Sequence, residues 1–168
     1  MEKVEMNKEA RLSEHFTLGE LCKTSAKTAD GNIPSHVHIE NLKRLCVSWL
    51  EPLRAEYNRK YGEDSSLVSG PHRSSLPIVI NSGYRSEAVN RAIGGVKGSN
   101  HLTGCAVDIH VSGMEQAIRY AAILIDISNE RKEDFDELLI EGKGFGSLWL
   151  HFAVRPSGNR RKIRFIQT

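Results

Sequence analysis

The stretch SNHLTGCAVDIH, residues 99–110, constrains the fold more than any other part of the sequence. It places His101 seven residues ahead of Asp108, with Thr103-Gly104 between them and the alternating run CAVDIHV at its end. Glycine lets a chain turn tightly, and alternation of this kind is typical of a strand. Histidine and aspartate are both zinc ligands, so a turn that leads into a strand here could bring two ligands to one metal ion.

A third ligand has to come from another part of the chain, and His151 is the candidate. It stands in LWLHFAV, a run of otherwise apolar residues, where a buried imidazole needs a polar partner. His101, Asp108 and His151 together with a water molecule fit a hydrolytic zinc site. Each residue also has an ordinary alternative. The histidines could be hydrogen-bonded core residues, and Asp108 could be a cap or the partner of an arginine.

Three segments resemble one family of zinc peptidases. SNHLTGCAVD matches the signature SxHxxGxAxD, INSGYRSEAVNRAIGG is similar to the SGYRSxxxN segment that precedes it, and LWLHFAV is similar to the WVHVS strand near the C-terminus. These segments are found in zinc D-Ala-D-Ala carboxypeptidases and dipeptidases and in phage L-Ala-D-Glu endolysins, whose fold is shared with the hedgehog signalling domain. The resemblance extends over about residues 13–155.

The resemblance implies a role for each matching residue. His101, Asp108 and His151 would ligate one zinc ion. Arg85, in SGYRS, would act in catalysis by holding a carbonyl or carboxylate of the substrate, because a guanidinium is a permanently charged, planar donor. Its alternative role is a structural salt bridge. Ser99 would contact the substrate backbone, and its alternative is a hydroxyl that caps a turn.

The sequence departs from the family pattern at the catalytic base. Many relatives carry an acidic residue three positions before the last zinc histidine, where this chain has Leu148. Hydrolysis at zinc needs a group that takes a proton from water and passes it to the leaving amine. Glu141, at the end of FDELLIE, is the predicted catalytic residue if that strand pairs with LWLHFAV, and a solvent-facing glutamate is the alternative. Asp136 and Glu137 are further candidates.

The pattern of apolar residues predicts an α+β fold in which helices flank an antiparallel sheet, as in the hedgehog and D-Ala-D-Ala carboxypeptidase type. Segments with the period of a helix lie at 39–57, 86–95 and 114–128. Short alternating or β-branched runs, expected to be strands, lie at 77–84, 105–111, 135–141, 148–154 and 161–168. Pro52 should kink or end the first helix, and Ser86 should cap the second.

The chain is predicted to hold one domain. Residues 1–12 read as a polar N-terminal lead, and residues 13–168 as a single zinc-peptidase-like domain. Residues 62–77 are rich in Gly, Ser and Pro and are expected to form a surface loop inserted in that domain.

The composition is that of an ordinary globular protein, with 39% hydrophobic residues and a net charge of +2. No apolar run approaches the roughly 18 residues of a membrane span, and the first residues lack the apolar centre of a signal peptide. Three cysteines without a CxxC motif favour buried thiols over disulfides. The basic segment RPSGNRRKIR lacks interleaved aromatic residues, so no nucleic acid is expected as partner, although it could help the protein reach an anionic cell wall.

The sequence therefore predicts a monomeric zinc metallopeptidase that acts on the peptide stems of bacterial peptidoglycan, as a D-Ala-D-Ala carboxypeptidase or an L-Ala-D-Glu endopeptidase. It would be synthesised as a soluble cytoplasmic protein and act at the cell wall after release. The alternative is a zinc-containing module that binds the cell wall or a protein without catalysis. Which bond is cut, and whether the origin is phage or host, stay open at this point.

Overall fold

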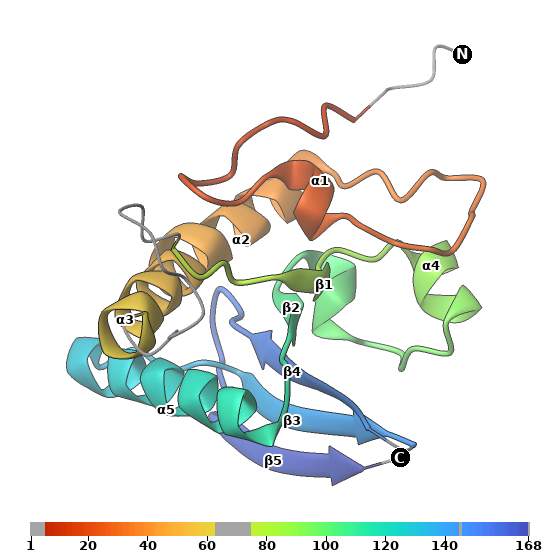
Figure 1. Ribbon diagram of the computed structural model, residues 1–168. Coiled ribbons are helices and arrows are strands. Elements are labelled where there is room, and N and C mark those ends of the chain that lie inside the picture. Colours follow the sequence, from red (N-terminus) through yellow and green to blue (C-terminus); the bar gives the residue numbers. More distant parts are fainter. Residues whose placement is uncertain (1–5, 63–74, 145, 168) are drawn as a thin grey trace.

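A computed structural model describes residues 6–62, 75–144 and 146–167 and shows a mostly antiparallel sheet with helices packed beside it (Figure 1). The predicted α+β class is confirmed. Of the predicted loop insertion at 62–77, residues 63–74 lie outside the described part of the chain.

The first half of the chain builds a helical layer. After the short helix α1 (Leu18–Leu21), three segments follow one another without a break: α2 (His36–Leu45), the π-helical η1 (Cys46–Leu50) and α3 (Glu51–Tyr61). The helix predicted at 39–57 is thus present and longer than expected. Pro52 lies at the start of α3, directly after the π-helical η1, so the boundary predicted there is a change in the type of helix and not the end of the helical run.

Three further helices surround the strands. They are α4 (Glu87–Ala92), the 3-10 helix η2 (Asn100–Thr103) and α5 (Met114–Arg131). Ser86 caps α4 as predicted, because its side chain accepts a hydrogen bond from the backbone N–H of Val89 at 3.2 Å. In the described part of the chain, no helix is both long and apolar enough to cross a bilayer.

The five strands are β1 (Ile80–Ser82), β2 (Ala106–His110), β3 (Glu137–Lys143), β4 (Ser147–Ala153) and β5 (Lys162–Gln167). Their order in the sheet is β1-β2-β4-β3-β5. All neighbours are antiparallel except β3 and β5, so the sheet is mostly antiparallel, as predicted, with one parallel pair at its edge.

The parallel pair follows from the path of the chain. β4 ends at Ala153, opposite Glu137, the first residue of β3. The segment 154–161 passes over this end of β3, and Lys162 begins β5 beside the same Glu137. Because β5 starts where β3 starts, the two strands must run in the same direction.

The two faces of the sheet differ in chemistry because successive side chains of a strand point to opposite sides. Val107, Ile109, Leu150 and Phe152 belong to one hydrophobic core together with residues of α2, η1, α3 and α5. Trp49 of η1 packs on Phe152 with ring centroids 5.3 Å apart. The alternate residues of β2, β3 and β4 therefore share the opposite face, which carries the polar side chains described below.

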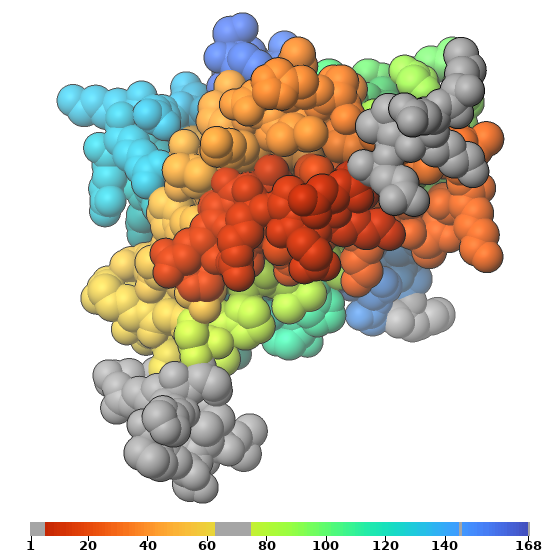
Figure 2. Space-filling model, turned by 90° about the horizontal axis from the view of Figure 1, so that it is seen from above, coloured from red at the N-terminus to blue at the C-terminus, as the bar shows by residue number. Residues whose placement is uncertain are grey.

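The N-terminal segment lies across the surface of the molecule next to the helical run (Figure 2). Leu12 is buried in the hydrophobic core, together with Phe16 and Leu18. Residues 1–5 of the predicted polar lead lie outside the described residues, and its boundary with the domain stays a prediction. The three cysteines are free and buried, as the composition suggested.

Gly104 closes η2 in the left-handed conformation, with φ +70°. A Cβ atom at this position would lie 2.6 Å from the backbone carbonyl oxygen of His38, at the contact between η2 and α2. Gly98 has a similar φ of +74°, but no atom lies within 4 Å of a Cβ built there. The two glycines therefore separate the cost of backbone conformation from the cost of a steric clash.

We predict that Gly104→Ala destabilises the protein by about 3 kcal/mol and Gly98→Ala by about 1 kcal/mol, because only the first change adds overpacking to the left-handed strain. Urea unfolding of the two variants measures the difference. Equal losses would show that η2 is not held against α2 by this close approach.

Candidate metal centre

His101 lies in η2, between the capping residue Ser99 and the turn at Gly104. Its imidazole is buried, and its Nδ1 lies 2.6 Å from the carbonyl oxygen of Gly83. A carbonyl oxygen can only accept, so Nδ1 carries the hydrogen and donates it. The neutral ring then presents the lone pair of Nε2 to the site, which is the arrangement that a metal ligand requires.

Asp108 and His151 face each other across the antiparallel pair β2–β4. Asp108 Oδ1 lies 2.9 Å from His151 Nδ1 and 3.2 Å from His101 Nε2. One ligand atom from each of the three residues lies within 4.8 Å of the other two. Ligand atoms around a tetrahedral zinc ion with bonds of about 2.0 Å would be about 3.3 Å apart, so the types of donor and the two distances from Asp108 Oδ1 fit zinc.

Arg85 controls how Asp108 presents its carboxylate. Its Nη2 donates to Asp108 Oδ2, and its Nε donates to Ser82 Oγ at 2.9 Å. Because Oδ2 is engaged, Oδ1 is the oxygen that faces both histidines. This ion pair is the structural salt bridge that was the alternative role of Arg85. Binding of substrate by this residue stays a prediction.

Glu137 forms a hydrogen bond with Nε2 of His151, the ring nitrogen that points away from Asp108. His151 Nε2 lies 3.3 Å from Glu137 Oε2. The same carboxylate accepts from Asn100 Nδ2 at 3.2 Å, from Arg160 Nη2 at 3.1 Å and from Lys162 Nζ at 3.2 Å. A carboxylate that accepts the Nε2 hydrogen fixes the ring and leaves Nδ1 for a metal. The sequence pointed to Glu137 only as a further candidate for the base, because its place next to His151 depends on the β3–β4 register.

The buried charges shift the pKa values of the three ligands. Burial lowers the pKa of His101, so its ring is neutral at neutral pH. Burial opposes ionisation of Asp108 as well, but the two histidines outweigh it and keep the pKa of this carboxyl low. For His151, hydrogen bonds to Asp108 and Glu137 overcome the opposing effect of burial and raise the pKa to about 9. The pKa of Glu137 falls to about 2, mainly through its bond to His151.

Glu141 lies on the same face of the sheet as His151. It pairs with Trp149 and stands two residues beyond Leu139, which is directly opposite His151. Burial raises the pKa of Glu141, while His151 acts in the opposite direction and Asp108 adds to the rise. From the sequence, Glu141 was expected to approach the site only if its strand pairs with LWLHFAV, and β3 and β4 do pair. Its catalytic role stays a prediction.

The other candidate residues have structural partners. Asp136 is fully buried and accepts hydrogen bonds from Arg160 and Asn100, at 2.7 Å and 2.8 Å from its Oδ2. Ser99 Oγ accepts from the backbone N–H of His101 at 3.3 Å, which agrees with a capping hydroxyl. Leu148, at the position of the expected acid, packs against the hydrophobic core. A contact of Ser99 with substrate stays a prediction.

Most cationic side chains of the basic segment at 155–164 pair with acidic residues of the fold. Arg160 pairs with Asp136 and Glu137, and Arg161 pairs with Asp134 at 3.1 Å. Lys162 also pairs with Glu137. These pairs weaken the idea of a free basic patch directed at the cell wall. The absence of a nucleic-acid partner stays an expectation.

Two buried imidazoles and one carboxylate, each oriented by a further hydrogen bond, could hold a metal ion in the manner of a zinc hydrolase. A sequence model of the family described as Peptidase M15 matches residues 14–132, and the chain belongs to this family of zinc-dependent metallopeptidases. The match includes Arg85, His101 and Asp108 and ends before His151. No curated protein matches the chain.

We predict that zinc binding at pH 7 releases about one proton. Without metal His151 is protonated, because its pKa of about 9 lies above the pH, whereas His101 is already neutral and Asp108 already ionised. The metal takes only the neutral imidazole, so affinity should rise with pH up to about 9. Calorimetry in two buffers of different ionisation enthalpy counts the protons.

His110 provides the control for this measurement, because it lies on the same strand as Asp108 but is exposed. His110→Ala should bind zinc with the same proton release, and His151→Ala should lose the site. Release of two protons, or of none, would contradict this assignment of charges.

We also predict that Glu137 sets zinc affinity through His151. Glu137→Leu removes the acceptor for Nε2 and should weaken zinc binding 10–100-fold, the usual effect of losing such a partner. Glu137→Gln keeps an acceptor oxygen and should lose less. Competition with a chromophoric chelator measures both, and unchanged affinity in the Leu variant would rule out this role.

Proposed function

We propose that the protein is a zinc peptidase that hydrolyses peptide bonds in the stem peptides of bacterial peptidoglycan. The observation that carries the proposal is the fixed arrangement of His101 Nε2, Asp108 Oδ1 and His151 Nδ1 around one point. Membership of the Peptidase M15 family supports the peptidase activity. The sequence resemblance to D-Ala-D-Ala carboxypeptidases and L-Ala-D-Glu endolysins supports the choice of substrate.

A zinc ion in this site would supply Lewis-acid activation of a water molecule and of the scissile carbonyl. The protein holds the ligands in place before metal or substrate arrives, since Gly83, Arg85 and Glu137 each fix one of them. Because these groups are already oriented, less free energy is needed to rearrange them during the reaction.

Glu141 is the proposed general base. It would take the proton of the attacking water and pass it to the nitrogen of the leaving group, a role that suits a carboxylate with a raised pKa. Its position on β3 supports this choice, because it shares the face of His151 while Asp136 and Glu137 are tied to cationic partners.

Arg85 is proposed to contact the substrate in addition to holding Asp108. Its Nε and Nη2 donate to Ser82 and Asp108, and no hydrogen bond within the described residues uses its Nη1. That nitrogen could donate to the carbonyl oxygen of the scissile bond as negative charge develops on it. Ser99, directly before Asn100 and His101, is the proposed contact for the substrate backbone.

The test is a digest of purified peptidoglycan by the zinc-loaded protein, read by mass spectrometry with and without a chelator. We expect chelator-sensitive release of defined peptide fragments, whose ends identify the bond. Glu141→Gln should retain zinc and lose at least about 100-fold in kcat, as is usual for a lost general base. Glu130→Gln on the exposed side of α5 is the matched control and should be fully active.

A zinc-loaded protein that binds peptidoglycan but releases no fragment would favour the alternative of a binding module. The apolar Leu148, at the position where relatives carry an acid, is the observation behind this alternative. Full turnover by Glu141→Gln would instead leave the peptidase assignment in place and exclude Glu141 as the base.

A further inference from the structure

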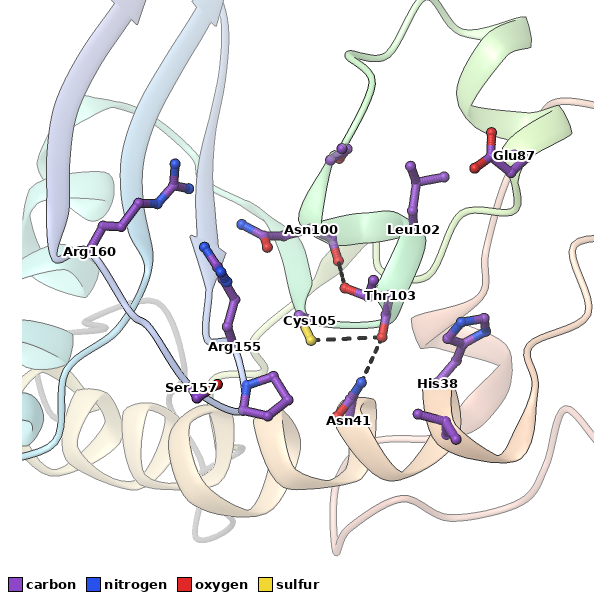
Figure 3. Close-up of a pocket in the computed structure, with 14 residues that line it drawn as sticks. His38, Asn41, Glu87, Asn100, Leu102, Thr103, Cys105, Arg155, Ser157 and Arg160 are labelled. Carbon is purple, nitrogen blue, oxygen red and sulfur yellow. Dashed lines mark hydrogen bonds between the residues drawn. The ribbon is translucent and has the colours of Figure 1, made fainter.

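A cavity of about 800 Å³ lies beside the metal centre, between α2, η2 and the segment that follows β4 (Figure 3). None of the three metal-binding side chains lines it, but Ser99 and Asn100, which directly precede His101, do. A peptide bound at the metal could therefore continue past η2 into this cavity. Its volume suits one or two residues of a peptide.

Two arginines mark one side of the cavity. Arg155 Nη1 lies 3.5 Å from Asp136 Oδ1, and Arg160 donates from Nε to the same oxygen at 2.8 Å. Their side chains are 40% and 51% exposed, and Figure 3 shows both on the same side as Asn100. No hydrogen bond in the described part of the chain uses Arg155 Nη2 or Arg160 Nη1. Both nitrogens remain available to a ligand.

The charges around these arginines leave a positive surplus. Arg155, Arg160 and Lys162 carry three positive charges, and their partners Asp136 and Glu137 carry two negative ones. An anionic group can therefore bind without leaving a buried carboxylate uncompensated. The anchoring of both guanidinium groups on Asp136 also reduces the entropy lost when they hold a ligand.

The other residues that line the cavity indicate which groups, besides a negative charge, a ligand should have. Val37, Leu102 and Pro156 provide apolar surface, and Asn41 and Ser157 provide polar contacts. Glu87 stands across the cavity from the arginines in Figure 3, and its side chain is largely exposed, so solvent screens it. An aliphatic residue with a carboxylate fits this mixture.

We propose that this cavity is a subsite for a carboxylate of the substrate peptide, held by charge-assisted hydrogen bonds from Arg155 Nη2 and Arg160 Nη1, one nitrogen from each guanidinium. The proposal rests on the proposed peptidase function and narrows its substrates to acidic peptides. It assigns substrate binding to residues 155 and 160, which in the sequence stand out only as part of a basic segment.

Arg155 is the residue to change, because Arg160 also supports Glu137 and through it His151. Two peptide pairs serve as probes: a stem pentapeptide ending in D-Ala-D-Ala and its C-terminal amide, and a stem with a free or an amidated α-carboxylate on D-Glu. Only the pair whose carboxylate occupies the cavity should respond. For that pair, Arg155→Gln should raise KM about tenfold for the free acid and less than twofold for the amide, with zinc content unchanged. Arg155→Lys keeps the charge but loses the planar guanidinium that can contact Asp136 and the ligand at once, so its KM for the free acid should lie between those of the wild type and Arg155→Gln.

Arg59→Gln on α3 removes the same charge far from the cavity and should change neither KM. An equal effect of Arg155→Gln on acid and amide would overturn the proposal, even if the enzyme cuts both peptides. If the wild-type protein cuts no peptide, the proposed function fails, and NMR titration with the same peptides still tests the subsite. Binding that prefers the free acid and depends on Arg155 would support the subsite, and binding without that preference would overturn it.

Discussion

The antiparallel pairing of β2 with β4 places Asp108 directly opposite His151, and the candidate metal centre depends on this register. A slip of one residue would turn His151 toward the hydrophobic core and bring Phe152 or Leu150 to the polar face. The core prevents such a slip, because Val107, Ile109, Leu150 and Phe152 are fully buried on the opposite side. The same alternation that buries the core therefore places the side chains of Asp108 and His151 next to each other on the opposite face.

Each of the three proposed ligands is fixed at its second polar atom by a different part of the fold. Gly83, in the turn after β1, holds His101, Arg85 before α4 holds Asp108, and Glu137 on β3 holds His151. Burial makes these bonds strong, because water does not compete for them. Glu137 in turn pairs with Arg160 of the neighbouring cavity, and Arg160 shares Asp136 with Arg155, so the candidate metal site and the proposed carboxylate subsite belong to one network of charges.

Much of this arrangement can be predicted from the sequence. The turn and strand around His101 and Asp108, the strand of His151 and most helices follow from local patterns, since each pattern reflects burial on one face. The parallel pairing of β5, the role of Glu137 and the convergence of Arg155 with Arg160 could not be predicted, because they depend on which strands become neighbours. The ion pair of Arg85 with Asp108 stood among the alternatives, but residue types alone could not select it.

The location of the metal is the central claim, and anomalous X-ray diffraction at the zinc absorption edge tests it most directly. Crystals grown with zinc should show one anomalous peak bonded to His101 Nε2, Asp108 Oδ1 and His151 Nδ1, with bonds of about 2.0–2.2 Å. The ring of His151 should keep its Nε2 toward Glu137. A peak at other residues, or coordination through the opposite nitrogen of either histidine, would contradict this location of the metal.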